Sequence, residues 1–276
     1  MDHLHVLTQQ ILNGEAVDDR FRRLIAPGAT LGGARPKALI DIDGEQWVLK
    51  FAEEAFSYEP WVEHATMTMA AQAGIVVATT RPVRLARGTA VAVRRFDRQG
   101  PLRLHALSAN VALRAAAAAL TYPDLAQLLR RRGDPTAGRH RAQMRELFRR
   151  LVFNILADNT DDHEKNHALL MTDAQHYVLS PAFDVLPTGQ SLGYQSMEVG
   201  EEGASSTLDN AMSMCKAYGL TTAQARSEMA AVARVVDGWQ THFAGEDIPP
   251  DVIATYATQI DRPFLLDQRR QALRYP

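Results

Sequence analysis

The pattern of apolar and polar residues in the first hundred positions predicts a small antiparallel sheet with one helix. Residues 38–42 and 45–51 alternate in polarity and are separated by Asp-Gly, a dipeptide that favours a two-residue hairpin turn. Residues 75–83 and 89–96 have the same strand character. Between these pairs, residues 58–73 are rich in Ala, Met and Trp and are followed by a glycine, which is typical of a helix end.

From residue 103 onward the apolar positions recur with helical spacing. The clearest helix is 139–157, whose apolar stripe consists of Met144, Leu147, Phe148, Leu151, Val152, Ile155 and Leu156. Further helices are predicted over residues 108–120, 122–132, 221–238, 250–260 and 262–274. The sequence therefore predicts an α+β, two-lobed fold, with a small β-rich lobe over residues 1–97 and a larger helical lobe over residues 98–276.

Composition and charge narrow the classes of protein. The chain has 276 residues, 46% of them hydrophobic, so it can bury a sizeable core. Its formal net charge of −2 creates no global basic field, and we expect no direct nucleic-acid binding. A single cysteine, Cys215, allows no disulfide within the chain. There is no signal-peptide pattern and no apolar run of membrane-spanning length, which predicts a cytoplasmic protein with no membrane contact.

The candidate chemistry lies in two polar motifs joined by a short strand. Asn166 follows Asp161 by five residues, which is the separation of the base and the metal-binding amide in the catalytic loop of kinases. Asp184 follows 18 residues later, and the strand expected over residues 176–180 can return it to the side of Asn166. Oxygen ligands of this kind suit Mg²⁺, which takes one or two carboxylates plus substrate phosphates. These residues predict a base, two metal ligands and a nucleotide.

A lysine on the second predicted strand fits the same chemistry. Alternation places Lys50 and Val48 on one face, as for the nucleotide-binding lysine of kinases, which has a small apolar residue two positions earlier. Taken alone, such a lysine is more often an edge-strand residue with its charge in water. Glu59 and Glu63 lie on the following helix, and one of them should pair with Lys50.

Residues 159–166 (NTDDHEKN), followed by residues 179–184 (LSPAFD), resemble the HipA family of serine/threonine kinases, the toxins of toxin–antitoxin modules. The resemblance runs from Thr30 to the C-terminal helices and implies a protein-kinase-like fold that uses ATP and Mg²⁺. It implies Asp161 as base, Asn166 and Asp184 as metal ligands, and Glu63 as the partner of Lys50.

The family pattern also implies roles for less distinctive residues. A phosphate-binding loop would contain Gly32, Gly33 and Ala34, with Thr30 before it as an autophosphorylation candidate. The adenine base would meet the backbone of Arg94, Arg95 and Phe96, where Arg94 replaces the usual acidic residue. Lys165 would meet the transferring phosphate, and His163 would brace the loop by hydrogen bonds. Asp162 is expected to face solvent or to cap a turn.

The resemblance implies partners as well. The substrate would be a protein, such as an aminoacyl-tRNA synthetase, whose phosphorylation arrests growth. Only 29 residues precede Thr30, so the chain is similar to the short, kinase-only members. Its antitoxin would be a helix-turn-helix DNA-binding protein or a small separate protein that supplies the missing N-terminal subdomain. Two alternatives are a small-molecule kinase of the aminoglycoside or choline type and a catalytically silent scaffold.

Two other patterns have competing interpretations. The arginine-rich segment over residues 130–150 could bind an acidic partner or nucleic acid, but a solvated helix face is favoured because the net charge is not basic and no aromatic residues interleave. His163 and His167 could suggest a transition-metal site, but no third ligand follows at a recognised spacing.

Overall fold

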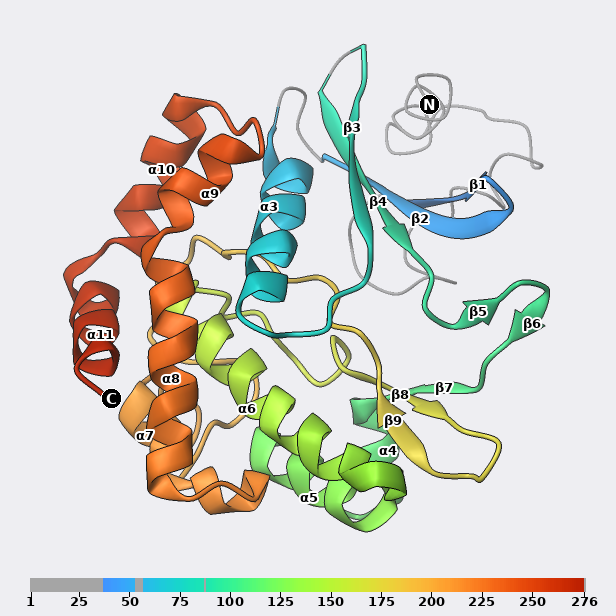
Figure 1. Cartoon of the computed structure of the whole chain (residues 1–276). Helices are drawn as coiled ribbons and strands as arrows, with labels where there is room; N and C mark the ends of the chain where they lie inside the picture. Colours follow the sequence, from blue (N-terminus) through green and yellow to red (C-terminus); the bar gives the residue numbers. More distant parts are fainter. Residues whose placement is uncertain (1–36, 53–56, 87, 276) are drawn as a thin grey trace.

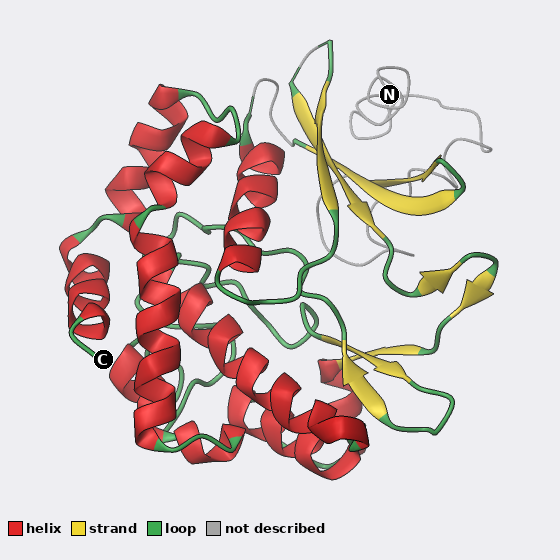
Figure 2. Ribbon diagram, viewed as in Figure 1, coloured by secondary structure: helices red, strands yellow, loops and turns green. Residues whose placement is uncertain are grey.

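The computed structural model of the protein describes residues 37–52, 57–86 and 88–275. A small sheet with one helix occupies one end, and most of the helices occupy the other (Figures 1 and 2). The elements of the first part are β1 Lys37–Ile42, β2 Glu45–Phe51, α3 Glu59–Gln72, β3 Thr80–Arg84, β4 Thr89–Arg94, β5 Arg98–Gln99 and β6 Leu102–Arg103. The predicted α+β class is confirmed.

The second part is helical apart from a three-stranded sheet of order β7-β8-β9. Its elements are β7 Ala106–Ser108, α4 Ala109–Ala115, α5 Tyr122–Arg132, the 3-10 turn η1 Thr136–Gly138, α6 Arg139–Leu156, β8 Ala168–Met171, β9 Tyr177–Leu179, α7 Leu208–Ser213, η2 Cys215–Tyr218, α8 Thr222–Asp237, α9 Trp239–Gly245, α10 Pro250–Ile260 and α11 Pro263–Leu273. No helix in the described ranges combines the length and apolarity needed to cross a membrane.

The first sheet is antiparallel with strand order β1-β2-β4-β3. Strand β2 lies in the middle, with Lys50 opposite Val91 of β4 and opposite Lys37 of β1. Because side chains alternate across a sheet, the two faces differ. One face carries a small core of its own, formed by Ala38, Trp47, Leu49, Phe51, Ala90 and Ala92. The opposite face, which includes Val91 and Val93, joins the main core of the molecule. Lys50 is buried on this second face and so lies toward α3.

Helix α3 is enclosed on nearly all sides. It contacts β3 and β4 of the sheet as well as α8 and α9 of the helical part, and ten of its residues are buried. Figure 1 shows it between the sheet and the C-terminal helices. A helix that is buried all round has no single apolar stripe. The carboxylate of Glu63 is therefore held in the interior, between the two parts of the chain.

Polar contacts fix α3 to α9. His64 contacts Thr80 through Nδ1 at 2.6 Å and Glu246 through Nε2 at 3.2 Å, while Thr68 lies 2.9 Å from His242 Nε2. Burial, opposed in part by Glu246, lowers the pKa of His64 from its ordinary value of 6.5, and the nearby His242 adds to the lowering. Protonation of His64 is therefore disfavoured in the folded protein relative to the unfolded chain.

This arrangement predicts a loss of stability in mild acid. With a lowered folded-state pKa, His64 binds fewer protons in the folded state, so its contribution is complete above pH 6.5 and declines as the pH falls from 6.5 toward the folded-state pKa. We expect the melting temperature to fall over this interval, and to fall less in His64→Gln. Thermal scans between pH 8 and pH 5 measure this, with the exposed His105→Gln as the matched control. A His64→Gln profile identical to wild type would contradict the prediction.

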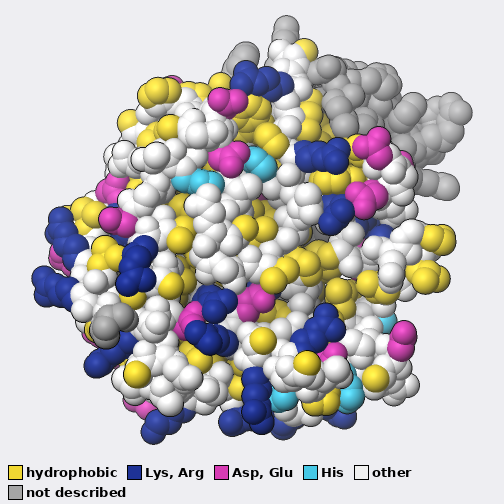
Figure 3. Space-filling view, in the orientation of Figure 1, with side chains coloured by type: hydrophobic (Ala, Val, Ile, Leu, Met, Phe, Trp, Pro, Cys, Tyr) yellow, Lys and Arg dark blue, Asp and Glu magenta, His cyan; other side chains and the backbone are white. Residues whose placement is uncertain are grey.

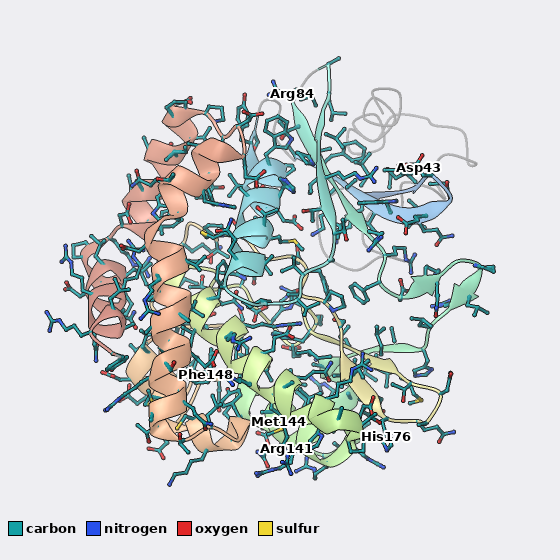
Figure 4. All side chains as sticks on the ribbon, viewed as in Figure 1. Asp43, Arg84, Arg141, Met144, Phe148 and His176 are labelled. Carbon is teal, nitrogen blue, oxygen red and sulfur yellow. The ribbon has the colours of Figure 1, made fainter. Side chains whose placement is uncertain are left out.

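Helix α6 is the centre of the helical part. All seven residues of its predicted apolar stripe are buried, and the helix contacts α5 on one side and α8 on the other. Met144 and Phe148 lie one turn apart on α6 in Figure 4, with Arg141 nearer the lower edge. The Phe148 ring makes an edge-on contact with Tyr218 at a centroid distance of 5.2 Å. This packing gives the loop that follows α6 a rigid support.

Several predicted boundaries are wrong. Strand β3 begins at Thr80 rather than at residue 75, and β4 ends at Arg94 rather than at residue 96. Helix α4 ends at Ala115 rather than at residue 120, because Ala117 takes a left-handed conformation with φ of 50°. Helix α7 begins at Leu208, with Thr207 as its N-cap, in a segment for which the sequence pattern predicted no element.

Candidate active site

Lys50 lies between two carboxylates that come from distant parts of the sequence. Its Nζ is 2.5 Å from Oε1 of Glu63 on α3 and 2.7 Å from Oδ1 of Asp184. Lys50 and Glu63 are buried, whereas the Asp184 side chain keeps 31% of its surface exposed. Burial alone would lower the pKa of Lys50, but the two carboxylates outweigh it and raise the pKa. The ammonium group is therefore charged, and of the two acidic residues on α3 the structure pairs Glu63 with it.

The segment before Asp184 is held against the loop that connects α3 to β3. The Ala182 amide donates to the carbonyl of Val76 at 2.8 Å, and the Ala78 amide donates to the carbonyl of Ala182 at 2.9 Å. Asp184 itself has a φ of 61°, in the left-handed region that few residues other than glycine enter. Such strained conformations cluster at functional sites. The backbone thus sets Asp184 beside the helix that carries Glu63.

The loop after α6 brings Asp161 and Asn166 together. The Asn166 side-chain Nδ2 donates to the Asp161 carbonyl at 3.3 Å, and the Asn166 amide donates to the His163 carbonyl at 2.9 Å. The Asp161 side chain is exposed, whereas Asn166 is buried. Asn166 also lines one small cavity together with Phe183, the residue before Asp184. The structure therefore joins the predicted base to one predicted metal ligand, Asn166, and places Asn166 on the same cavity as the two neighbours of Asp184 in the chain, Phe183 and Val185.

Arg150 is a supporting residue that the sequence did not distinguish from its arginine neighbours. It is 3% exposed, pairs with Glu146 one turn earlier on α6 at 2.5 Å, and donates to the Ser180 carbonyl at 2.7 Å. A weaker bond reaches the Val76 carbonyl at 3.5 Å. The guanidinium group thus joins α6 to the segment before Asp184 and to the α3–β3 loop.

The arginine-rich segment over residues 130–150 is accordingly not one solvated face. Arg145 and Arg149 both bond the carboxylate of Glu228 on α8, which is 3% exposed. Figure 3 shows basic side chains distributed over the lower part of the molecule, where α5 and α6 lie. Arg130 and Arg141 are exposed and form no ion pair with any described residue. The segment combines buried structural arginines with a solvated remainder.

One expectation for the catalytic loop is wrong. Asp162 does not face solvent: it is 2% exposed and accepts hydrogen bonds from Tyr122, Asn154 and His167. His163 contributes its backbone carbonyl, which accepts from the Asn166 amide at 2.9 Å, while its buried side-chain Nδ1 has no hydrogen-bond partner among the described residues. The side-chain contact within the loop is made by His167, which lies against Asp162. The direction of a side chain in an irregular loop is not set by a regular period. Its burial therefore depends on partners that are distant in the sequence.

Residues 94–97, which connect the two parts of the chain, already form hydrogen bonds and ion pairs within the protein. The amides of Arg94 and Arg95 donate to the carbonyls of Thr79 and Gln46 at 2.8 and 2.9 Å. The Arg94 side chain pairs with Glu45, and Arg95 pairs with Asp97. The Phe96 ring lies 5.3 Å from that of Phe183. Adenine contact by this backbone remains a prediction.

Of the remaining predicted site residues, Val48 and Lys165 lie in the described part of the chain. Val48 is half-buried beside Lys50 on β2 and faces Leu39 and Val93 in the sheet register. Lys165 is exposed, with no ion pair to any described residue. Its contact with a phosphate stays a prediction. Thr30, Gly32, Gly33 and Ala34 lie outside the described residues.

The side chains at this site fit a magnesium-bound nucleotide. Asn166 uses its amide nitrogen for the Asp161 carbonyl, and this bond leaves the amide oxygen available as a ligand. An amide oxygen and a carboxylate beside an ammonium group form the partial ligand set that Mg²⁺ completes with substrate phosphates. In the described part of the chain, no cluster of three or more His, Cys, Asp and Glu side chains could hold a metal, so His163 and His167 form no such site there.

Comparison with solved structures supports a two-lobed, protein-kinase-like fold. The HipA chain of the Shewanella oneidensis MR-1 toxin–antitoxin complex with HipB and operator DNA aligns over 97% of this chain and 70% of its own, with a TM-score of 0.69 and 19% identity. The proinflammatory kinase CtkA of Helicobacter pylori aligns over 91% of this chain and 97% of its own, with a TM-score of 0.63 and 12% identity.

Residues 29–239 match the HipA-like C-terminal domain, and the chain belongs to this family of HipA-like kinases. A curated relative, named "Putative kinase Y4dM", from Sinorhizobium fredii is 30% identical over 166 residues. That match covers 52% of this chain and 38% of the relative, so the chain spans well under half the length of the relative. The resemblance seen in the sequence motifs is confirmed.

Proposed function

We propose that the protein is an ATP- and Mg²⁺-dependent kinase that phosphorylates a serine or threonine hydroxyl of a protein substrate. The observation that carries this proposal is the Lys50 ammonium group, which contacts Glu63 of α3 and Asp184 at the same time. Kinases use a strand lysine paired with a helix glutamate to hold the α- and β-phosphates, beside an Asp that holds Mg²⁺. Family membership supports the same class of reaction.

Each side chain has a defined task in this reaction. Lys50 binds the α- and β-phosphates, and Glu63 keeps its ammonium group in place from the interior of the molecule. Asn166 and Asp184 hold Mg²⁺, which when bound neutralises the charge that develops on the phosphates. Asp161, exposed at the surface, orients the substrate hydroxyl and accepts its proton on the carboxylate. Lys165 and the loop from Thr30 to Ala34 complete the phosphate contacts.

Similarity to a toxin of known structure supports a toxin role for the proposed kinase. The solved Shewanella HipA belongs to a toxin–antitoxin system and was crystallised with HipB and operator DNA. By analogy, this chain acts in the cytoplasm on a translation component such as an aminoacyl-tRNA synthetase, arrests growth, and is restrained by its own antitoxin. That antitoxin is a helix-turn-helix protein or a small N-subdomain-like protein. Autophosphorylation of Thr30 provides self-regulation.

A label-transfer experiment tests the proposed reaction. The purified chain is incubated with γ-labelled ATP and Mg²⁺, separately with a panel of aminoacyl-tRNA synthetases, with aminoglycosides and with choline. We expect label on a protein hydroxyl, and only when Mg²⁺ is present. Label on a small molecule alone would replace the proposal with a small-molecule phosphotransferase. Nucleotide binding without any transfer would make the protein a scaffold.

A growth experiment tests the toxin role separately. Expression of the wild-type chain should arrest growth, whereas Asp184→Asn, which removes a metal ligand, should not. Phosphoproteomics of the arrested cells then identifies the substrate. Equal growth of both strains at equal protein levels would contradict the toxin role and leave the kinase reaction intact.

A further inference from the structure

Asp162, the residue that directly follows the proposed base in the sequence, is a buried carboxylate with no role in the reaction described above. Asp162 is 2% exposed and accepts hydrogen bonds from three side chains. Asn154 Nδ2 and His167 Nε2 each lie 2.8 Å from its Oδ2, and the Tyr122 hydroxyl bonds the same oxygen. The Tyr122 hydroxyl and the Asn154 amide donate to this oxygen, and His167 donates to it in the tautomer that carries its proton on Nε2.

The partners of Asp162 come from three separate elements. Tyr122 opens α5, Asn154 lies in the last turn of α6, and His167 directly precedes β8. Asn154 also donates to the Tyr122 hydroxyl at 3.1 Å and accepts from Asn159 at 3.1 Å. The side chains that contact Asp162 are thus carried by two helices and by the residue before β8. Rigid elements of this kind can hold a loop within the tolerance that catalysis needs.

The position of the Asp162–His167 bond along the chain is the informative feature. Asp162 directly follows Asp161, and His167 directly follows Asn166. The bond therefore closes residues 161–166 at both ends, as a staple between the neighbour of the base and the neighbour of a metal ligand. The backbone at the second end is fixed as well, because the His167 carbonyl accepts from the Ala109 amide at 2.8 Å.

We propose that Asp162 and His167 are positioning residues that set the separation of Asp161 and Asn166. This inference rests on the proposed kinase function. Phosphoryl transfer depends on placing the hydroxyl, the metal and the phosphates within tenths of an ångström, and a misplacement of about 1 Å costs about 10²-fold in rate. The staple supplies that placement from the interior, where water does not compete for its hydrogen bonds.

Two substitutions at one position separate a positioning role from a general structural one. The Gln side chain in His167→Gln places an amide nitrogen near the site of Nε2 and can still donate to Asp162. The chemically equivalent but shorter side chain in His167→Asn cannot reach it. We expect His167→Gln to keep kcat within about fivefold of wild type and His167→Asn to lose about 10²-fold in kcat. The KM for ATP should change less than about threefold in both, because Lys50 and Glu63 hold the phosphates independently.

Hydrogen exchange gives a readout that needs no catalysis. Peptides that span residues 158–168 should exchange faster in His167→Asn than in wild type or His167→Gln, while peptides from α6 stay protected. Tyr122→Phe keeps the ring and removes the hydroxyl that donates to Asp162, so it should raise the exchange rate of the same peptides by a smaller factor. This variant replaces His167→Asn in the experiment if His167→Asn does not fold.

The outcomes separate the two proposals. Faster exchange together with a selective loss of kcat supports the positioning role. Unchanged exchange, an equal kcat for the Asn and Gln variants, or a loss confined to KM overturns it. A wild-type chain that transfers no label to any acceptor defeats the kinase function, whereas the exchange measurement still decides whether the staple orders the loop.

Discussion

Replacing Asp161 by asparagine should reduce kcat for phosphoryl transfer by about 10²–10⁴-fold, the usual contribution of a positioned general base. Asparagine keeps the shape of the side chain and removes its ability to accept the hydroxyl proton. Because Asp161 is exposed and its contact with Asn166 uses the backbone carbonyl, the substitution leaves the loop contacts intact. Nucleotide affinity and melting temperature should therefore stay at wild-type values.

The matched control for this experiment is Asp173→Asn, which makes the same change at an exposed position in the turn between β8 and β9. Steady-state transfer assays give kcat, and calorimetric titration gives the affinity for Mg²⁺·ATP. If Asp161→Asn retains more than a tenth of wild-type kcat, another group accepts the proton and the assignment of Asp161 is wrong.

Replacing Lys50 by methionine should cost both stability and nucleotide binding. The substitution removes the ammonium group that neutralises Glu63, which is 1% exposed. Breaking a buried ion pair by removing one partner destabilises by about 3–5 kcal/mol. We expect a loss of this size in the free energy of unfolding, together with a large loss of affinity for ATP.

A double variant separates the two effects. In Lys50→Met combined with Glu63→Gln, the buried charge is gone, so most of the stability should return while ATP affinity stays low. Chemical denaturation measures the first and calorimetric titration the second, with the exposed Lys216→Met as control. Recovery of ATP affinity in the double variant would show that Lys50 acts only as a structural cation.

The parts of the fold that obey a regular period could be predicted from the sequence. Alternation placed Val48 and Lys50 on one face of β2, and the helical spacing of α6 identified all seven of its buried apolar residues. The pairing of Lys50 with Glu63 followed from the kinase pattern and is present at 2.5 Å. Regular elements repeat the same local geometry, so local sequence suffices to place their side chains.

The features that the sequence did not predict have no regular spacing of apolar residues. Helices α7 and α9 have six and seven residues, too few to display a stripe. The burial of Asp162 depends on Tyr122, which is 40 positions away, and Arg150 resembles every other arginine in its segment until its bond to Ser180 is seen. These outcomes depend on tertiary contacts, which a pattern along the chain does not encode.

The attachment of α3 has a consequence for where the chain can be shortened. Thr68 and Gln72 of α3 contact His242 on α9, which begins at Trp239, where the family match ends. Helix α9 is thereby linked to the helix that carries Glu63, although most of α9 lies beyond the family match. A truncation after residue 239 should therefore weaken binding of the nucleotide triphosphate, although all the proposed catalytic residues are still present in the chain.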